Sequence, residues 1–293
     1  MTPPSPYRLP SHGGGDFVMT IRDGIASRLL VVDDSPVLVR AWESGRQRVT
    51  VRAEVVDPSA VAVPSPAAGD GLRPAGREEL AMAAARIRFA LGVDDDLGEF
   101  YRRFRRDPLL GPAIRRRPWR RPQRRPWPWE ALAWAVVEQL IESGRAARIE
   151  RRIVGRWGAR LGPRGAQLRD VPSAGLIAGR APAELEAAGL SPKRSIALAT
   201  VARQIAAGRV SPDEQSADRR LRAIPEIGPW TVQCLGLFGR GDPDSLPAGD
   251  LIYLKLVGRL ARLGRRATVE EVEEFYAPYA PYRGLAGAWT VSL

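Results

Sequence analysis

LRAIPEIGPWTVQCLGLFGRGDPDSLPAGD, which runs from Leu221 to Asp250, is the stretch that decides the fold. It predicts one helix that ends near Ala223, then a tight turn, and a second helix that begins at Pro229. Proline suits the first position of a helix because the backbone N–H is not needed there. The sequence therefore predicts two short helices joined by a hairpin turn from Ile224 to Gly228.

The second predicted helix begins with N–H groups that have no partner inside the helix, at Gly228, Trp230 and Thr231. Unpaired donors at the positive end of a helix favour a phosphate group. Asp250 closes the stretch and precedes the apolar run LIYLKLVGRLARL, so it is predicted to be the N-cap of a third helix. The pattern alone leaves open whether this carboxylate is only a cap or has a chemical role.

The composition favours a polyanionic partner. The chain has 45 Lys plus Arg against 33 Asp plus Glu in 293 residues, a net charge of +12, and nearly all of the basic residues are arginine. Such an excess is typical of proteins that bind nucleic acid. A genome rich in arginine codons would produce the same bias, and the composition does not separate the two explanations.

Cysteine and histidine are too rare for several classes of site. Cys234 is the only cysteine and His12 the only histidine, which excludes an intramolecular disulfide, a cysteine-bound iron–sulfur cluster and a cysteine-based zinc site. The amino terminus lacks the apolar core of a signal peptide, and no apolar run approaches roughly 18 residues. We expect a cytoplasmic, nucleoid-associated monomer.

The predicted fold class is α+β. Residues 1–15 are expected to be a disordered tail, and residues 16–92 an N-terminal α+β domain with a small antiparallel β-sheet and a Pro/Ala/Gly-rich loop at 57–77. Residues 93–293 are expected to form an all-α domain. LLVVDDSP, residues 29–36, is also typical of the first strand of receiver domains, but no lysine precedes Lys193, as that fold would require.

An arginine run crossed by tryptophans extends from Arg102 to Arg125. Arginines interleaved with aromatic side chains can follow a nucleic-acid backbone. A solvated loop that its tryptophans anchor to the core explains the same pattern. Whether this segment contacts DNA stays open.

Several motifs resemble those of one family. IPEIGPWT, followed before the next helix by PAGDL, resembles the helix-hairpin-helix (HhH-GPD) DNA glycosylase superfamily, and within it the DNA-3-methyladenine glycosylase II branch. PWPWEALAWAVVEQLI, SPKR and YAPYAPYRGLAGAW match further family segments in the same order. The resemblance covers about residues 80 to 293 and implies a helix-hairpin-helix glycosylase domain.

The resemblance implies a monofunctional glycosylase of base excision repair. Such an enzyme flips a damaged base out of double-stranded DNA, hydrolyses the N-glycosidic bond of alkylated purines such as 3-methyladenine and 7-methylguanine, and leaves an abasic site. Asp250 would stabilise the positive charge that develops on the sugar. A non-catalytic DNA-binding relative, or a glycosylase for deaminated or oxidised bases, remains an alternative.

The resemblance also assigns roles to further residues. Trp230, Tyr282 and Cys234 would form the base pocket, and Leu140, beside Gln139, would fill the gap left by the flipped base. DNA would be bound by Gln139, Leu140, Lys193, Arg194, Gly228, Trp230 and Thr231, and the carbonyls of Arg222, Ile224 and Ile227 would hold a monovalent cation (Na+ or K+). The alternatives are a core position for Leu140 with Gln139 as a helix cap, and a core position for Trp230 at the start of its helix.

Two departures from the family pattern matter. Bifunctional members carry a lysine where this chain has Trp230, and neither Lys193 nor Lys255 lies at the motif, so no AP lyase activity is expected. The family hairpin reads Pro-Gly-x-Gly, whereas Glu226 here places a carboxylate where a phosphate would approach. Repulsion by Glu226 would weaken DNA binding unless its side chain turns to solvent, and the sequence leaves this effect open.

Overall fold

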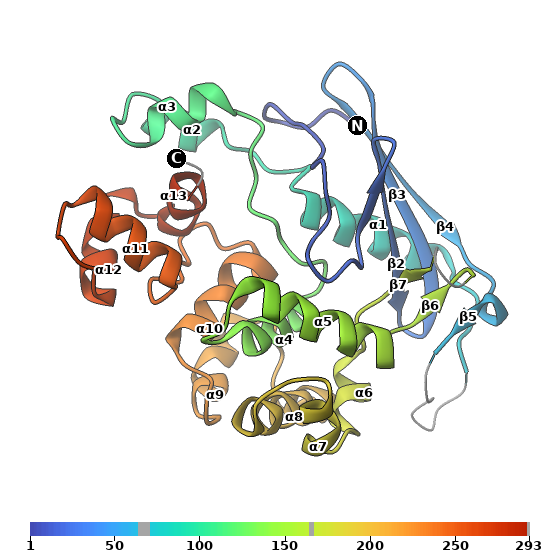
Figure 1. Cartoon of the computed structure of the whole chain (residues 1–293). Helices are drawn as coiled ribbons and strands as arrows, with labels where there is room; N and C mark the ends of the chain where they lie inside the picture. The colour runs from blue at the N-terminus through green and yellow to red at the C-terminus, as the bar shows by residue number, and fades with distance from the viewer. Residues whose placement is uncertain (64–70, 164–166, 292–293) are drawn as a thin grey trace.

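The computed structural model describes residues 1–63, 71–163 and 167–291 and places one antiparallel sheet beside a larger helical body (Figure 1). Four strands pair in sequence order: β1 (Thr20–Arg22), β2 (Ile25–Val32), β3 (Ser35–Gly45) and β4 (Arg48–Val55). The predicted α+β fold with an N-terminal antiparallel sheet is confirmed.

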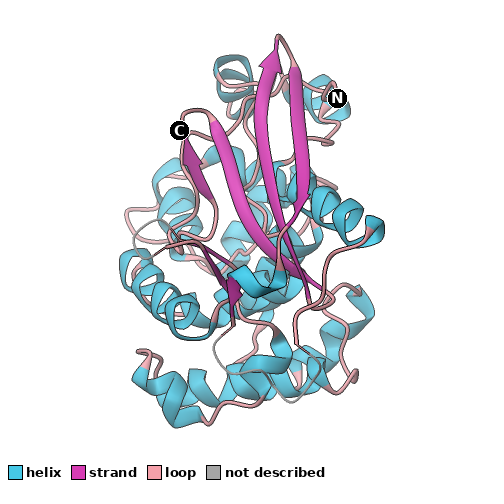
Figure 2. Cartoon of the chain, turned by 90° about the vertical axis from the view of Figure 1, so that its right-hand side faces the viewer, coloured by secondary structure: helices cyan, strands magenta, loops and turns pink. Residues whose placement is uncertain are grey.

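The sheet is covered on both faces, because successive side chains of a strand point in opposite directions. Leu30 of β2 packs in a cluster with residues of α1 (Arg77–Leu91). Its neighbour Leu29 packs with Val61 and Ala159 on the other side. Figure 2 shows the strands lying along one side of the helical body.

Asp33 and Asp34 form the turn between β2 and β3. Their φ angles are 45° and 61°, the left-handed conformation that a two-residue hairpin turn requires at both positions. The paired aspartates are therefore turn residues, which removes the basis for a receiver domain.

Residues 1–15 lie against the sheet, contrary to the disordered tail that we expected. The Met1 ammonium donates to the Val49 carbonyl (3.0 Å), and the Leu9 N–H donates to the Glu43 carboxylate (2.7 Å). Leu9 is also buried. The Pro- and Ser-rich composition did not reveal these contacts, because they are made with residues distant in the sequence.

The expected boundary at residue 92 does not separate all strands from the helices. β5 (Val61–Ala62) pairs with β6 (Arg160–Leu161), which pairs with β7 (Leu168–Arg169), so the helical region contributes a hairpin to a second small sheet. The expected loop at 57–77 includes β5 and a short 3-10 helix (Pro58–Ala60). Its residues 64–70 lie outside the described part of the chain.

The helices after α1 form two cores. One surrounds the almost fully buried α4, and the other joins α2 and α3 to the last helices of the chain. None of the helices in the described ranges is long and apolar enough to cross a membrane. The helices are α2 (Gly98–Phe104), α3 (Leu110–Arg116), α4 (Pro128–Glu138), α5 (Ser143–Trp157), α6 (Ala174–Ala178), α7 (Pro182–Ala187), α8 (Pro192–Ala206), α9 (Asp218–Arg222), α10 (Pro229–Cys234), α11 (Leu251–Leu260), α12 (Val269–Tyr276) and α13 (Arg283–Thr290).

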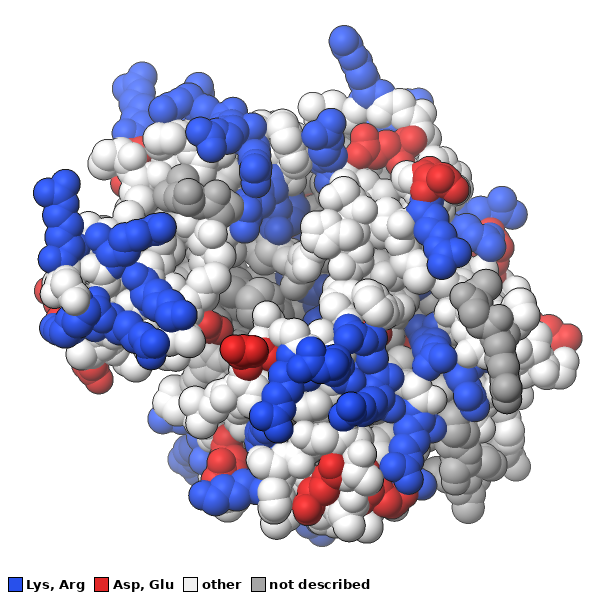
Figure 3. Space-filling view, viewed as in Figure 1, with Lys and Arg blue, Asp and Glu red and all other residues white. Residues whose placement is uncertain are grey.

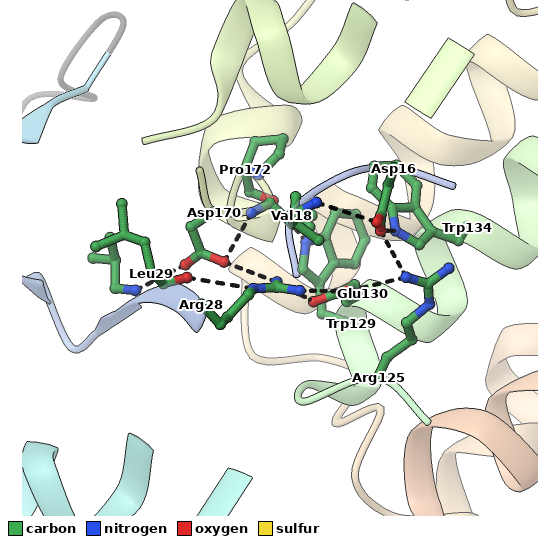
Figure 4. A network of polar contacts seen from close by, with 12 residues as sticks. Asp16, Val18, Arg28, Leu29, Arg125, Trp129, Glu130, Trp134, Asp170 and Pro172 are labelled. Carbon is green, nitrogen blue, oxygen red and sulfur yellow. Dashed lines mark hydrogen bonds and ion pairs between the residues drawn. The ribbon is translucent and has the colours of Figure 1, made fainter. Parts of the chain in front are cut away.

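A buried network of charges fixes the sheet against α4 (Figure 4). Arg28 of β2 pairs with Glu130 of α4 (2.8 Å) and with Asp170 beyond β7 (3.1 Å). Arg125 pairs with Asp16 (2.6 Å). Burial raises the pKa of Glu130, and the two arginines oppose this effect. Because each charge is paired, the network sets the position of α4 relative to the sheet at a tolerable desolvation cost.

Candidate active site

The stretch from Leu221 to Asp250 folds as a helix, a turn and a helix. α9 ends at Arg222, the Ile227 N–H donates to the Ile224 carbonyl (3.1 Å) within the turn, and α10 begins at Pro229. A π-helical segment (Leu235–Arg240) continues α10. The hairpin therefore forms where Pro229 and Gly228 predicted it.

The start of α10 is open to an incoming group. The N–H groups of Gly228, Trp230 and Thr231 donate to no backbone acceptor within the described ranges. A Cβ atom added to Gly228 would meet nothing within 4 Å. Protein packing therefore does not require glycine at this position, and the open space beside Gly228 leaves room for an anion to approach the helix start, although Thr231 itself is buried.

Asp250 is the N-cap of α11. Its Oδ1 accepts from the Ile252 N–H (2.9 Å), and its Oδ2 accepts from the indole Nε1–H of Trp230 (3.3 Å). No ion pair joins it to a basic residue of the described chain, and the side chain is half-buried. Neutral donors thus orient this carboxylate without cancelling its charge.

Asp250 borders a cleft of about 1420 Å³. Its walls come from the sheet, from the segment between α3 and α4, and from the end of the hairpin with α11 and α13. In Figure 1 the α3–α4 segment passes between the sheet and the α11–α13 region. The lining includes Ile25, Trp42, Trp119, Arg120, Phe238 and Tyr253. The cleft therefore offers aromatic and apolar surface beside the Asp250 carboxylate.

Trp230, Cys234 and Tyr282 do not form the pocket that we assigned to them together. Trp230 contacts Asp250, whereas Cys234 is buried, and its burial raises the pKa of the thiol. Tyr282 packs edge-on against Phe100, with ring centroids 5.7 Å apart, and is not among the residues that line the cleft. The partly buried ring packs against the aromatic core between α2 and α13, and a role of Tyr282 in the base pocket stays a prediction.

Gln139 and Leu140 form a turn at the end of α4, next to the hairpin. The Gln139 Nε2 donates to the Glu226 carbonyl (2.7 Å) and to the Thr231 Oγ1 (2.9 Å). Leu140 has a φ of 53°, and its side chain is fully exposed, at 105%. An apolar core position for Leu140 is therefore wrong, and its side chain projects into solvent.

Arg194 stabilises this turn through hydrogen bonds to backbone carbonyls. It is only 8% exposed, and its Nη1 donates to the carbonyls of Val137 (2.7 Å) and Gln139 (3.3 Å). Burial lowers the pKa of its guanidinium. We expected Arg194 to contact DNA; the structure corrects this, since the side chain satisfies the carbonyls at the end of α4 and so positions Gln139 and Leu140.

Glu226 occupies a position that favours glycine. Its φ is 69°, in the left-handed region, which accounts for glycine at this place in the family pattern. The carboxylate lies 3.7 Å from the Nζ of Lys193, whose side chain is 80% exposed. Lys193 therefore partly neutralises the charge that Glu226 brings to the hairpin.

The arginine run is divided between two roles. Arg121 and Arg124 both pair with Asp95, and Arg125 belongs to the buried network, so the end of the run anchors the α3–α4 segment. Arg117, Arg120 and Arg121 line the cleft, so Arg121 belongs to both groups. Figure 3 shows further Lys and Arg side chains gathered over α5 and over the α2–α3 and α11–α12 regions, around a central hollow.

Tyr253 and Arg120 are among the cleft residues to which the sequence analysis gave no individual role. Tyr253 follows Asp250 by three positions on a helix, a spacing that places both on one face and was the available signal. Arg120 had no such signal, because nothing local distinguishes it from the arginines around it.

Sequence comparison finds relatives but no matching family model. The probable bifunctional transcriptional activator/DNA repair enzyme AlkA of Mycobacterium tuberculosis is 30% identical over 175 residues, which is 59% of this chain and 35% of that protein. The DNA-3-methyladenine glycosylase of Bacillus subtilis is 27% identical over 182 residues, 60% of each chain. The chain spans less than two thirds of the length of either relative.

Solved structures extend the likeness to the N-terminal sheet. The 3-methyladenine DNA glycosylase from Archaeoglobus fulgidus has a TM-score of 0.75 at 20% identity, over 93% of this chain and 87% of that one. The 8-oxoguanine glycosylase/lyase of Clostridium acetobutylicum has a TM-score of 0.68 at 15% identity, over 98% and 92%. These findings show that the chain has the fold of these DNA glycosylases and is similar in sequence to DNA repair enzymes of this kind.

Proposed function

We propose that this protein is a DNA glycosylase of base excision repair that removes alkylated purines from double-stranded DNA and leaves an abasic site. The observation that carries the proposal is Asp250, a carboxylate without a cationic partner at the edge of a cleft with aromatic walls. Two relatives that are named for 3-methyladenine excision support the class of substrate.

The chemistry follows from the position of the charge. When the N-glycosidic bond breaks, its electron pair leaves with the base and positive charge develops at C1′ of the sugar. The Asp250 carboxylate stabilises that charge. Water then adds to C1′ and loses a proton, for which the carboxylate is the nearest base in this scheme. A purine alkylated at N3 or N7 is already cationic and departs neutral, so no general acid is needed.

The hairpin and the turn at the end of α4 would bind the DNA. A base reaches the cleft only after it leaves the duplex, and Leu140 would fill the gap that it leaves. The N–H groups of Gly228, Trp230 and Thr231 would bind a backbone phosphate, with Lys193 beside them. The Clostridium acetobutylicum enzyme has been crystallised in complex with double-stranded DNA, which supports DNA as the partner.

We further propose that the enzyme lacks AP lyase activity. Trp230 stands in the hairpin helix where the bifunctional pattern has lysine. Lys193 lies beside Glu226 at the protein surface, and Lys255 is exposed next to Arg259 and Arg262. Neither lysine lines the cleft, so neither is placed to form a Schiff base with C1′.

The hairpin turn fits the monovalent cation that the family implies. The carbonyls of Arg222 and Ile227 accept no backbone N–H within the described ranges, while the Ile224 carbonyl accepts only within the turn. These three carbonyls would hold Na+ or K+, whose charge would strengthen phosphate binding. We propose that the protein acts without any other cofactor, as a monomer, in the nucleoid-associated cytoplasm.

The test is release of free base from methylated duplex DNA, followed by strand analysis with and without alkali. The proposal predicts released methylpurine and strand breaks that appear only after alkali. No released base would indicate the alternative, a non-catalytic DNA-binding protein. Release restricted to hypoxanthine or oxidised guanine would change the class of substrate, and breaks without alkali would refute the absence of lyase activity.

A further inference from the structure

The exposed face of α5 carries a row of four arginines, which we call the α5 stripe. Its members follow one another at intervals of three or four residues, and all are exposed: Arg145, Arg148, Arg152 and Arg156. Residues at this spacing are neighbours on one face of a helix. From the first to the last of them the helix rises about 16 Å.

No carboxylate neutralises the α5 stripe. None of its arginines forms an ion pair with a residue in the described ranges. Arg152 donates to the Ala188 carbonyl (3.5 Å), and Arg156 lies over a neighbouring tryptophan ring, but neither contact cancels a charge. The acidic residue of α5, Glu150, is 2% exposed and faces the core, and the exposed Glu142 precedes the helix at its N-cap. The stripe therefore presents positive charge along its whole length.

Arg151, on the same helix, has a different environment. Its Nη1 donates to the Gly15 carbonyl (2.7 Å), and its guanidinium lies 4.8 Å from the centroid of the Phe17 ring. Arg151 is half-buried and anchors the segment before β1 to α5. One helix thus carries an arginine that the protein uses for its own packing and four that face outward.

The α5 stripe begins next to the turn that carries Leu140. α5 starts at Ser143, directly after this turn. Gln139, in the same turn, donates to Glu226 and Thr231 of the hairpin, so the turn and the hairpin are in contact. Figure 3 shows the basic side chains over α5 beside the central hollow. The stripe therefore continues the surface that we propose for DNA.

We propose that the duplex on one side of the lesion lies along α5, with its phosphates against the α5 stripe. This inference rests on the proposed function, which places the gap left by the flipped base at Leu140. Each DNA strand carries one phosphate per roughly 3.4 Å of axis, so a stripe of about 16 Å matches about five base pairs. Guanidinium groups bind phosphate oxygens and carry no sequence information. The stripe therefore binds damaged and undamaged duplex alike.

Arg145→Gln/Arg148→Gln tests the contact, because neither side chain has a hydrogen bond or ring contact in the described chain to lose. The slope of log affinity for undamaged duplex against log salt concentration should become less steep by about 1.8, which is about 0.9 for each lost phosphate contact. Arg148→Gln alone should change it by about 0.9. Arg151→Gln is the matched control, since it removes the same charge from the inner side of α5, and should leave the slope unchanged. Arg145→Lys/Arg148→Lys should keep the wild-type slope, because lysine also binds phosphate.

Shortened duplexes test the direction of the contact. Each carries a tetrahydrofuran abasic analogue and ends about three base pairs from it, on one side or on the other, so that one flank cannot reach along the stripe. Wild-type protein should lose affinity for one of the two duplexes only, and Arg145→Gln/Arg148→Gln should lose it for neither. An equal loss from both flanks, or a wild-type salt slope in the double glutamine variant, would overturn the inference. These measurements need no catalysis, so failure of the proposed function, seen as no release of methylated base, is observed separately.

Discussion

Carboxylates in two regions of this molecule have opposite surroundings. Between the sheet and α4, Glu130 and Asp170 pair with the buried Arg28 at 2.8 and 3.1 Å. At the cleft, Asp250 accepts hydrogen bonds only from the neutral N–H groups of Ile252 and Trp230. The same chemical group is neutralised in one place and left charged in the other.

Solvent access explains the difference. A fully buried carboxylate without a counter-ion costs several kcal/mol, so Glu130 is stable only beside arginine. Asp250 is half-buried at the positive end of α11, where solvent and two N–H donors suffice. Pairing with arginine thus stabilises the buried carboxylates of this network, whereas Asp250 keeps a charge that no arginine compensates and that a cationic transition state can use.

Replacement of Asp250 should produce the largest effect on activity. A small effect would contradict the contrast between the unpaired Asp250 and the paired carboxylates. Asparagine caps a helix about as well as aspartate, so Asp250→Asn should change the free energy of unfolding by less than roughly 1 kcal/mol. Base release should fall roughly a thousandfold, about 4 kcal/mol in the activation barrier. Single-turnover release from methylated DNA and urea unfolding measure the two quantities. Equal release by variant and wild type would remove Asp250 from catalysis.

Glu130 should show the reverse pattern. Glu130→Gln leaves Arg28 with one carboxylate fewer in a site that excludes water, so the free energy of unfolding should fall by about 3 kcal/mol. Base release per folded molecule should stay near that of wild type. Urea unfolding measures the loss.

Glu54 provides the matched control, because it pairs with Arg40 at 2.7 Å on the partly exposed β3–β4 surface. Glu54→Gln should cost less than about 1 kcal/mol. If both variants lost the same stability, burial would not be what separates the two kinds of ion pair.

The sequence predicted the parts of the site that depend on near neighbours. Pro229, Gly228 and Asp250 determine a helix start, a turn and a cap over a few residues, and each lies where it was expected. Arg194 illustrates the limit. Its direction is decided by the carbonyl of Val137, 57 positions away, and no pattern around SPKR distinguishes an inward arginine from one that faces DNA.

The sequence did not reveal the packing of Tyr282 or of residues 1–15, for the same reason. A tyrosine near the carboxyl terminus matched an aromatic position of the family, but Phe100 and Phe104 offer its ring a buried aromatic cluster. Leu9 likewise packs on a sheet that is formed by later residues. The network around Arg28 was missed because its members come from four separate segments.

Leu140 extends the comparison to apolar side chains. Its side chain is fully exposed in the free protein, so Leu140→Ala should leave the free energy of unfolding unchanged. Release of base from duplex DNA should fall roughly tenfold, because the gap left by the flipped nucleotide is no longer filled. Met82→Ala is the control, since Met82 is 45% exposed on α1, and it should alter neither quantity. A loss of stability in Leu140→Ala would show that this side chain packs on the protein instead.

Substitutions of Glu226 should have the smallest effect. Glu226 is a carboxylate at the proposed DNA surface, and its only ion pair in the described chain is a 3.7 Å contact with Lys193, so it lies between the paired and the unpaired carboxylates. Glu226→Gln removes the charge and keeps the strained φ; Glu226→Gly removes both. Affinity for duplex DNA should rise roughly threefold in each variant, and less at high salt, because the repulsion is screened. The free energy of unfolding of the glycine variant should change by less than about 1 kcal/mol, because relief of the left-handed backbone strain opposes the larger unfolded-state entropy of glycine.

Fluorescence anisotropy at several salt concentrations measures the affinity of both Glu226 variants for duplex DNA. Weaker binding by both variants would show that the carboxylate places Lys193 on the DNA, which would make Glu226 a positioning group and not a repulsive one.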